Sequence, residues 1–366
     1  MARSMPKNSK VPLGVVECFF GPPWPWKSRL AAAEFMSKLG MDFYYYGPKA
    51  DRQLRMDWIR PWSSEYLESL QTTTRHFQNY NIEFGVILSP VGLAGRADGE
   101  KSLTTKMENI FFEKIRILTQ ELGVKRLGVF FDDIEYRVGM LESQIRLMNQ
   151  VREETDASIL YCPTFYSEDP ILDKVFGQRP NQAFEMIGET LNTSIDVVWT
   201  GRKVITESWT ASDLFEMTQK IRRKPFVCDN FYANDGPKNC QILKLKAPTH
   251  VNSELISLAK GWGINPMNEP ESSKLALTLF MSGRAEMNFS ADTLLKTIVE
   301  SYCTPALSHW ILQNQSWMIH EGLPSLPESR RQEASALLGD INDPLAREIV
   351  DWINGKFHVG SECLTD

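Results

Sequence analysis

The feature that most constrains the fold is a repeated alternation of short apolar runs with longer segments of helical periodicity. The runs are nearly continuous in apolar residues, which is typical of strands buried on both faces of a parallel sheet. Eight such alternations predict a (β/α)8 barrel, with a doubly wound open sheet as the alternative. The apolar runs are Pro12–Glu17, Asp42–Tyr46, Glu83–Leu88, Arg126–Phe131, Ser158–Cys162, Asp196–Trp199, Phe226–Cys228 and Gly261–Ile264.

The pattern changes after about residue 271, where helical periodicity continues without further strand-like runs. We therefore expect a polar N-terminal segment at 1–11, the barrel domain at 12–285 and a helical C-terminal region at 286–366. The segments expected to form helices are Lys27–Leu39, Ser63–Tyr80, Thr104–Leu122, Leu141–Thr155, Asn181–Leu191, Ala211–Arg223, Ser272–Ser282, Ala291–Tyr302, Pro305–His320, Glu328–Leu338 and Pro344–Lys356.

Composition and charge exclude several classes of protein. The chain has 366 residues, of which 42% are hydrophobic and 23% charged, so a disordered or fibrous protein is excluded. A net charge of −6 without a basic block argues against nucleic acid as a partner. No apolar run is long enough to span a membrane, and no apolar segment follows the polar residues 1–10 as in a secretion signal. These patterns predict a cytoplasmic location.

The cysteines and histidines do not form a metal-binding pattern. The six cysteines are scattered without CxxC spacing, and none of the five histidines is paired at ligand spacing. We therefore expect free thiols in a reducing compartment, no metal site and no cofactor.

Polar residues follow nearly every apolar run, and in a barrel they would converge on one mouth. Asp132 and Asp133 come directly after the fourth run. Because two adjacent carboxylates repel each other, one pKa is expected to rise, which leaves one ionised and one protonated group near neutral pH. This asymmetry suits glycoside cleavage. A helix N-cap with a solvated acid, or a pair of magnesium ligands, remains an equally good interpretation.

A second polar cluster, Asp229-Asn230 with Asn234-Asp235, lies beside aromatic residues. Amides and carboxylates next to aromatic rings suit a ligand rich in hydroxyl groups, although an Asx-rich turn would have the same composition. Lys49 lies just past the second run and could reach the mouth, or it could be solvated.

Several motifs in order resemble family 84 of the glycoside hydrolases, which comprises protein O-GlcNAcases and bacterial hyaluronidase-type N-acetyl-β-glucosaminidases. The resemblance covers roughly residues 12–285 and is specific as a joint match. The motifs are Gly14-Val15-Val16-Glu17-Cys18-Phe19-Phe20-Gly21, Tyr46-Gly47-Pro48-Lys49, Phe131-Asp132-Asp133-Ile134, Cys162-Pro163-Thr164, Trp199-Thr200-Gly201, Asp229-Asn230, Ala233-Asn234-Asp235 and Asn265-Pro266.

The resemblance implies retaining, metal-free hydrolysis in which the 2-acetamido oxygen of the substrate attacks the anomeric carbon and forms an oxazoline. It implies that Asp132 stays ionised and accepts from the acetamide N–H. Asp133 would be the general acid and then the base for water, and Tyr166 would hydrogen-bond the developing oxazoline.

The resemblance also implies sugar-binding residues. Asp235 would bind the O4 and O6 hydroxyls with Asn265 nearby, Asn230 would contact the acetamido region, and Lys49 would contact the pyranose hydroxyls. Cys18 and Cys228 would line the same pocket.

Four residues depart from the family pattern. Cys18 replaces a glycine whose backbone approaches the sugar, and Cys228 replaces a tryptophan that forms a stacking wall. Pro22 replaces an arginine, and Phe165 replaces an acidic residue. These departures suggest an altered substrate preference more than lost activity.

The leading hypothesis is therefore a glycosidase that removes β-linked N-acetylhexosamine, by default N-acetylglucosamine, from a glycan or glycosylated protein. The alternatives are a weak or inactive sugar-binding homologue and a hydrolase of another 2-acetamido sugar. Neither nucleic acid nor a membrane is expected as a partner, whereas a homodimer through the C-terminal helices is possible.

Overall fold

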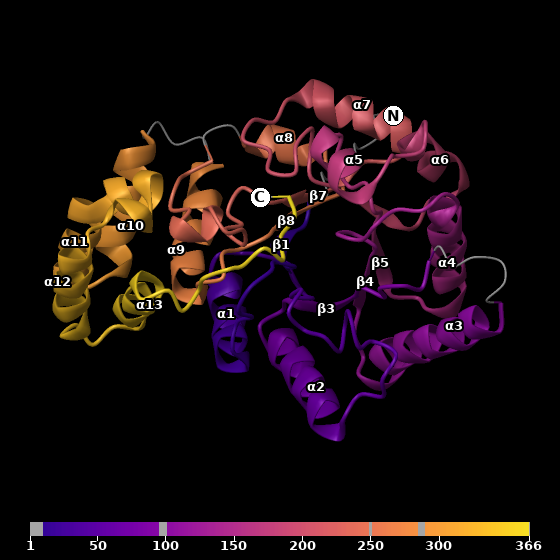
Figure 1. The fold of residues 1–366 in the computed structure, drawn as a ribbon, viewed down its shortest axis with the longest axis horizontal. Helices are drawn as coiled ribbons and strands as arrows, with labels where there is room; N and C mark the ends of the chain where they lie inside the picture. The colour runs from indigo at the N-terminus through magenta and orange to yellow at the C-terminus, as the bar shows by residue number, and fades with distance from the viewer. Residues whose placement is uncertain (1–9, 95–100, 249–250, 285–289, 366) are drawn as a thin grey trace, which may run out of the picture.

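The computed structural model describes residues 10–94, 101–248, 251–284 and 290–365, and in these residues eight parallel strands close into a barrel (Figure 1). Each strand pairs with its neighbours in chain order, and β8 returns to β1. The sequence prediction of a (β/α)8 barrel is confirmed. The strands are β1 Leu13–Glu17, β2 Phe43–Tyr46, β3 Glu83–Leu88, β4 Arg126–Phe130, β5 Ser158–Cys162, β6 Asp196–Trp199, β7 Phe226–Asp229 and β8 Gly261–Ile264.

Helices surround the barrel and connect the strands (Figure 1). Side-chain caps fix where several begin; Ser63, for example, accepts a hydrogen bond from the Tyr66 N–H at the start of α2. The barrel helices are α1 Trp26–Lys38, α2 Ser64–Asn79, α3 Lys101–Arg116 with a π-helical turn at Ile117–Glu121, α4 Met140–Glu154, α5 Pro170–Phe176, α6 Ala183–Thr190, α7 Ala211–Ile221 and α8 Ser253–Ser257.

The barrel has two apolar layers. Side chains such as Val16, Phe43, Leu160 and Phe226 fill its interior, and the larger layer lies between the strands and the surrounding helices. The interior layer continues upward to Cys18, Cys162, Tyr166 and Cys228 at the carboxyl ends of the strands. At the mouth of the barrel this interior layer meets the polar side chains that follow the strands.

The C-terminal helices pack on one side of the barrel (Figure 1). The Glu348 carboxylate accepts hydrogen bonds from the Glu271 and Ser272 N–H groups at the start of α9. The boundary expected at 285/286 and most of the segment expected at 1–11 lie outside the described residues. These helices are α9 Pro270–Gly283, α10 Ala291–Tyr302, α11 Pro305–Ser316 with a π-helical turn at Trp317–Glu321, α12 Glu328–Gly339 and α13 Pro344–Ile353.

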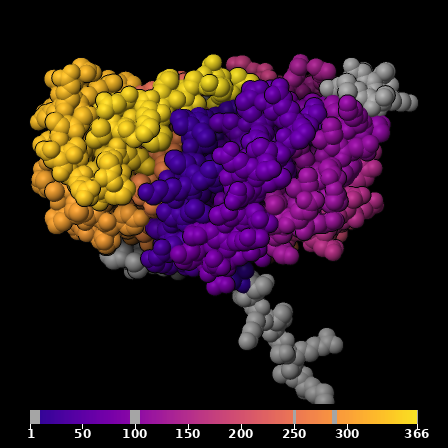
Figure 2. All heavy atoms as spheres, turned by 90° about the horizontal axis from the view of Figure 1, so that it is seen from below, coloured from indigo at the N-terminus to yellow at the C-terminus, as the bar shows by residue number. Residues whose placement is uncertain are grey.

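After α13 the chain returns to the barrel, and its end lies over the mouth (Figure 1). Figure 2 shows these C-terminal residues as a band that extends from the helical side onto the barrel. Among the described helices, none combines the length and apolar character required to cross a bilayer.

Candidate active site

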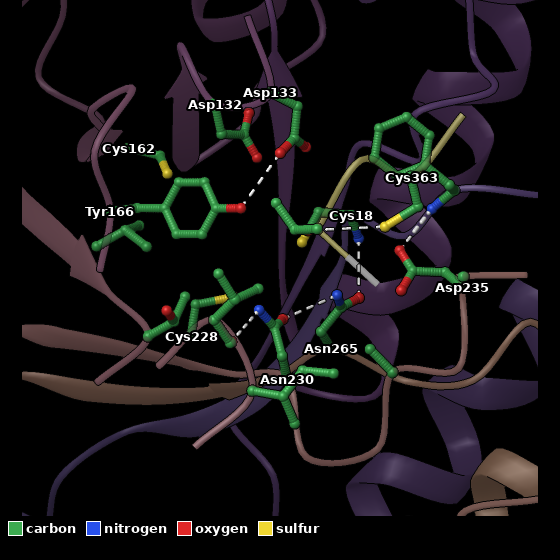
Figure 3. Close-up of a pocket in the computed structure, with 18 of the residues that line it drawn as sticks. Cys18, Asp132, Asp133, Cys162, Tyr166, Cys228, Asn230, Asp235, Asn265 and Cys363 are labelled. Carbon is green, nitrogen blue, oxygen red and sulfur yellow. Dashed lines mark hydrogen bonds between the residues drawn. The ribbon is translucent and has the colours of Figure 1, made fainter. Parts of the chain in front are cut away.

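The pocket at the carboxyl ends of the strands collects the predicted site residues (Figure 3). Because the barrel is parallel, side chains that follow different strands meet at this one end. The space left open to water-sized molecules is about 50 Å³. Of the predicted residues, those that line the pocket are Cys18, Asp132, Asp133, Tyr166, Cys228, Asn230, Asp235 and Asn265.

Asp132 follows β4 and is 7% exposed. Its Oδ2 accepts from the Lys49 ammonium, with 2.5 Å between the two atoms. Its Oδ1 is buried and has no hydrogen-bond partner among the described residues. A buried carboxylate oxygen without a donor is costly, so this atom can gain free energy from an N–H or O–H that a ligand brings into the pocket.

Asp133 has different surroundings, although it is the next residue. Its Oδ1 accepts from the Tyr166 hydroxyl at 3.2 Å, the contact drawn in Figure 3. Burial and the charge of Asp132 raise the pKa of Asp133, while the charges of Lys49 and Arg55 oppose the rise. The pocket therefore favours a protonated Asp133 more than an isolated carboxyl would allow. The two acids therefore differ in their contacts: Asp132 is bound to Lys49 and has one unpartnered oxygen, whereas Asp133 accepts from Tyr166.

Lys49 lies behind the two aspartates and is not among the residues that line the pocket. Its Nζ is 3.3 Å from Asp133 Oδ2 as well as in contact with Asp132. Its side chain is 4% exposed, so the alternative of a solvated lysine is wrong. In this arrangement Lys49 neutralises the acid pair, and its expected contact with sugar hydroxyls stays a prediction.

A chain of hydrogen bonds joins four strand ends around the pocket. The Asn265 amide donates to Asn230 Oδ1 at 3.0 Å, and Asn230 donates to the Val204 carbonyl, also at 3.0 Å. Asn265 Oδ1 in turn accepts from the Cys18 N–H at 3.4 Å. Figure 3 shows the Asn230–Asn265 contact at the floor of the pocket. These amides fix the position of β1 relative to β7 and β8.

Asp235 lies on the opposite side of the pocket from Tyr166 (Figure 3). Its Oδ2 accepts from the Phe20 N–H at 2.9 Å. Burial raises the pKa of Asp235 to about 6, and the charge of Asp133 contributes to the rise. At neutral pH this carboxylate can accept from hydroxyl groups that enter the pocket.

Four thiols line this pocket: Cys18, Cys162 and Cys228 from the strand ends, and Cys363 from the C-terminal segment. All six cysteines of the chain are free, as the sequence predicted. A hydrogen bond to Cys228 and burial raise the pKa of the Cys18 thiol well above its usual value. Cys18 is therefore a neutral thiol that lies next to Cys228 in the pocket wall, and thiolate chemistry at Cys18 is disfavoured.

Other polar residues at the strand ends stabilise the fold. Glu17 is fully buried and forms a two-atom ion pair with Arg29. Asp229 accepts from the Phe231 N–H in an Asx turn and from the Trp262 indole. The Asx-turn alternative is therefore correct for Asp229, while its neighbour Asn230 lines the pocket.

Cys363 and Thr365 from the C-terminal segment also line the pocket and were not among the predicted residues. Figure 3 places Cys363 beside Asp235, and burial together with the charge of Asp235 raises the pKa of the Cys363 thiol to about 12. Sequence patterns give no signal for this contact, because it depends on how the chain returns from α13. In the part of the chain that the structure describes, no cluster of three or more His, Cys, Asp or Glu could hold a metal ion.

The site combines a barrel mouth, a pair of aspartates and surrounding amides, which is the type of site that acts on carbohydrates. Similarity to known proteins identifies the family. A sequence model of the β-N-acetylglucosaminidase family matches residues 13–308, so the chain belongs to that family. This finding confirms the resemblance to family 84 of the glycoside hydrolases.

Individual relatives agree with this assignment. Protein O-GlcNAcase from Rattus norvegicus and from Mus musculus are each 29% identical to the chain over 290 residues, or 75% of its length. The chain spans only 30% of the length of either relative. A solved structure of a mutant Thermobaculum terrenum O-GlcNAc hydrolase covers 93% of this chain and is itself covered to 80%, with a TM-score of 0.71 and 23% identity. That likeness supports the fold.

Proposed function

We propose that the protein is a retaining glycoside hydrolase that removes β-linked N-acetylglucosamine from a protein or glycan with the help of the substrate's own acetamide. Family membership and the names of its relatives support the substrate class. The observation that carries the proposal is the buried, unpartnered Oδ1 of Asp132 at the pocket. An acetamide N–H is a donor of the right chemistry for this oxygen.

In the first step Asp132 accepts a hydrogen bond from the acetamide N–H. This contact orients the carbonyl oxygen toward the anomeric carbon and stabilises the positive charge that develops on the amide. The ammonium of Lys49 pairs with Oδ2 of Asp132 and leaves its Oδ1 free for the acetamide. The anomeric C–O bond breaks as the C–O bond of the oxazoline forms.

Asp133 donates its proton to the departing oxygen in the same step. In the second step it accepts a proton from the water that opens the oxazoline, which restores the original anomeric configuration. Tyr166 lies within hydrogen-bond distance of Asp133 and can donate to the oxazoline oxygen as charge develops. Asn230 then contacts the acetamido side, and Asp235, with Asn265 nearby, accepts from the hydroxyls at the far side.

The experiment that tests this function uses 4-nitrophenyl β-glucosaminides whose 2-acetamido group carries zero to three fluorine atoms. Fluorine withdraws electrons and weakens the carbonyl oxygen as a nucleophile. We expect kcat/KM to fall steadily along the series, by about tenfold or more from acetyl to trifluoroacetyl, if that oxygen attacks in the rate-limiting step. Equal rates along the series would contradict substrate assistance.

A sugar-binding homologue without turnover is the second candidate, and one observation favours it. Cys363 and Thr365 line the pocket, and Cys363 lies beside Asp235, where a sugar would need space (Figure 3). Calorimetric titration with N-acetylglucosamine, combined with a panel of aryl glycosides that differ at C2 and C4, separates the possibilities. Binding without turnover supports this candidate, and faster turnover of a C4 epimer identifies a different 2-acetamido sugar.

A further inference from the structure

Arg55 is a buried cation at the active site that the reaction described above does not use. It lies after β2 and is 8% exposed. Its guanidinium donates to the Asp133 carbonyl at 3.0 Å and to the Ser89 hydroxyl at 2.9 Å, and it has a longer contact of 3.5 Å with the Asp132 carbonyl. All three acceptors are uncharged oxygens, and two of them belong to the main chain of the acid pair.

The backbone that Arg55 contacts has an uncommon conformation. Asp133 has a φ of 54°, in the left-handed region that few residues other than glycine adopt. This conformation turns the chain sharply after β4 and determines where the Asp133 side chain points. Because the general acid sits on this turn, a small rotation of the peptide would displace its carboxyl from the leaving oxygen.

The turn is held from both sides. On the β5 side, the Thr164 hydroxyl donates to the Phe131 carbonyl at 2.8 Å, and Gln144 donates to Thr164. On the β3 side, Arg55 bridges Ser89 to the two aspartate carbonyls. The planar fork of an arginine suits this task because it reaches several acceptors with one rigid group.

We propose that Arg55 is a positioning residue for the general acid: it fixes the left-handed turn at Asp133 and thereby aims the acid carboxyl into the pocket. This inference rests on the proposed function and deepens it. It assigns to Arg55 no contact with the substrate. The charge of Arg55 also opposes the rise in the pKa of Asp133, so Arg55 affects both where the acid points and when it is protonated.

Several groups face Asp133 besides Arg55, and they stay in place in the test. From β2, β4, β5 and β7 or the segments that follow them, and from the C-terminal segment, these groups are Lys49, Asp132, Tyr166, Cys162, Asp235 and Cys363. Because these groups are unchanged in the Arg55 variants, a change in the pH dependence of kcat/KM is attributed to the loss of the Arg55 side chain.

The test compares Arg55→Met, Arg55→Lys and a control, Arg223→Met. Arg223 also donates to main-chain carbonyls, those of Leu191 and Ile195, but it lies before β7 at the opposite end of the barrel. Each variant is assayed with N-acetyl-β-glucosaminides that carry 2,4-dinitrophenyl, 4-nitrophenyl and 4-methoxyphenyl groups. Thermal unfolding identifies any variant that fails to fold.

We expect Arg55→Met to lose little kcat/KM on the 2,4-dinitrophenyl substrate and about tenfold more on the 4-methoxyphenyl substrate, which depends on protonation of its leaving oxygen. The basic limb of its pH profile, where kcat/KM falls with rising pH, should move to higher pH by about one unit. The reason is that loss of a nearby cation raises the pKa of the acid. Arg55→Lys should keep the limb and lose part of the rate. Arg223→Met should change neither property.

An equal loss of rate on all three leaving groups, with an unmoved basic limb, would mean that Arg55 has only a structural role. If the wild-type protein hydrolyses none of the substrates, the proposed function fails, and Arg55 is tested by carbon-13 titration of the Asp133 carboxyl. A pKa for Asp133 that is higher in Arg55→Met than in the wild type supports the inference. An unchanged titration overturns it.

Discussion

Asp132 and Asp133 are adjacent in the sequence, but their contacts differ. Asp132 has Lys49 on one oxygen and no donor among the described residues on the other. Asp133 has the Tyr166 hydroxyl and a left-handed backbone. The adjacency of the two carboxyl groups in the sequence is enough to predict that their properties differ. Which carboxylate oxygen has a hydrogen-bond donor and which has none could not be predicted from the sequence, because the donors come from strands and loops far apart in the chain.

A prediction at this scale concerns the pH dependence of catalysis. The acid must be protonated to donate, so kcat/KM should fall as pH rises through the raised pKa of Asp133. Asp133→Asn should lose this basic limb and about 100-fold or more in rate on substrates with poor leaving groups. Steady-state rates from pH 4 to 10 provide the measurement, with Cys303→Ser as a control away from the pocket. Persistence of the limb in Asp133→Asn would assign it to another group.

At the scale of elements, the start of α9 has an uncommon carboxyl group. Glu269 precedes α9, is fully buried and accepts from the Asn234 amide at 2.8 Å. Burial raises the pKa of Glu269 to about 8, and the charge of Glu348 contributes. The folded state therefore favours the protonated form of Glu269, whereas the unfolded chain ionises near the usual value for glutamate.

Stability should depend on pH accordingly. The pKa of Glu269 is higher in the folded protein than in the unfolded chain, so the contribution of Glu269 to the free energy of unfolding is fully present at low pH. This contribution is lost as pH rises from about 4.5, the usual pKa of the group, to about 8, its pKa in the folded state. Glu269→Gln keeps the acceptor for Asn234 and cannot ionise. We expect its Tm to exceed that of the wild type by about 2 °C or more at pH 8, with a smaller difference at pH 5. Thermal unfolding at both values gives the comparison, and a difference that does not grow with pH would refute the assignment.

The elements themselves were largely predictable. All eight strands were found within one residue at each end, because buried parallel strands leave continuous apolar runs. The expected helix at Ala291–Tyr302 is confirmed, whereas α5 and α8 were missed. Those two helices have seven and five residues, which is too short for a clear helical period.

At the scale of the whole molecule, the return of the chain from α13 to the barrel mouth was not predictable. The segment carries no motif, and its position depends on the packing of α13 against α9. It brings Cys363 and Thr365 into a pocket whose other lining residues lie in barrel strands or in the segments that follow them. The C-terminal region therefore packs on the side of the barrel and also lines the pocket. A sugar that enters the pocket requires space beside Asp235.

The central claim is that Asp132 holds the substrate acetamide while Asp133 handles the proton. Calorimetric titration with the thiazoline analogue of the oxazoline tests this claim most directly, because it requires no turnover. We predict that the wild type and Asp133→Asn bind the analogue with similar affinity. Asp132→Asn should bind it about 100-fold more weakly, since the charge-assisted hydrogen bond between the Asp132 carboxylate and the N–H of the protonated thiazolinium is lost. Equal affinity in Asp132→Asn and the wild type would contradict the account.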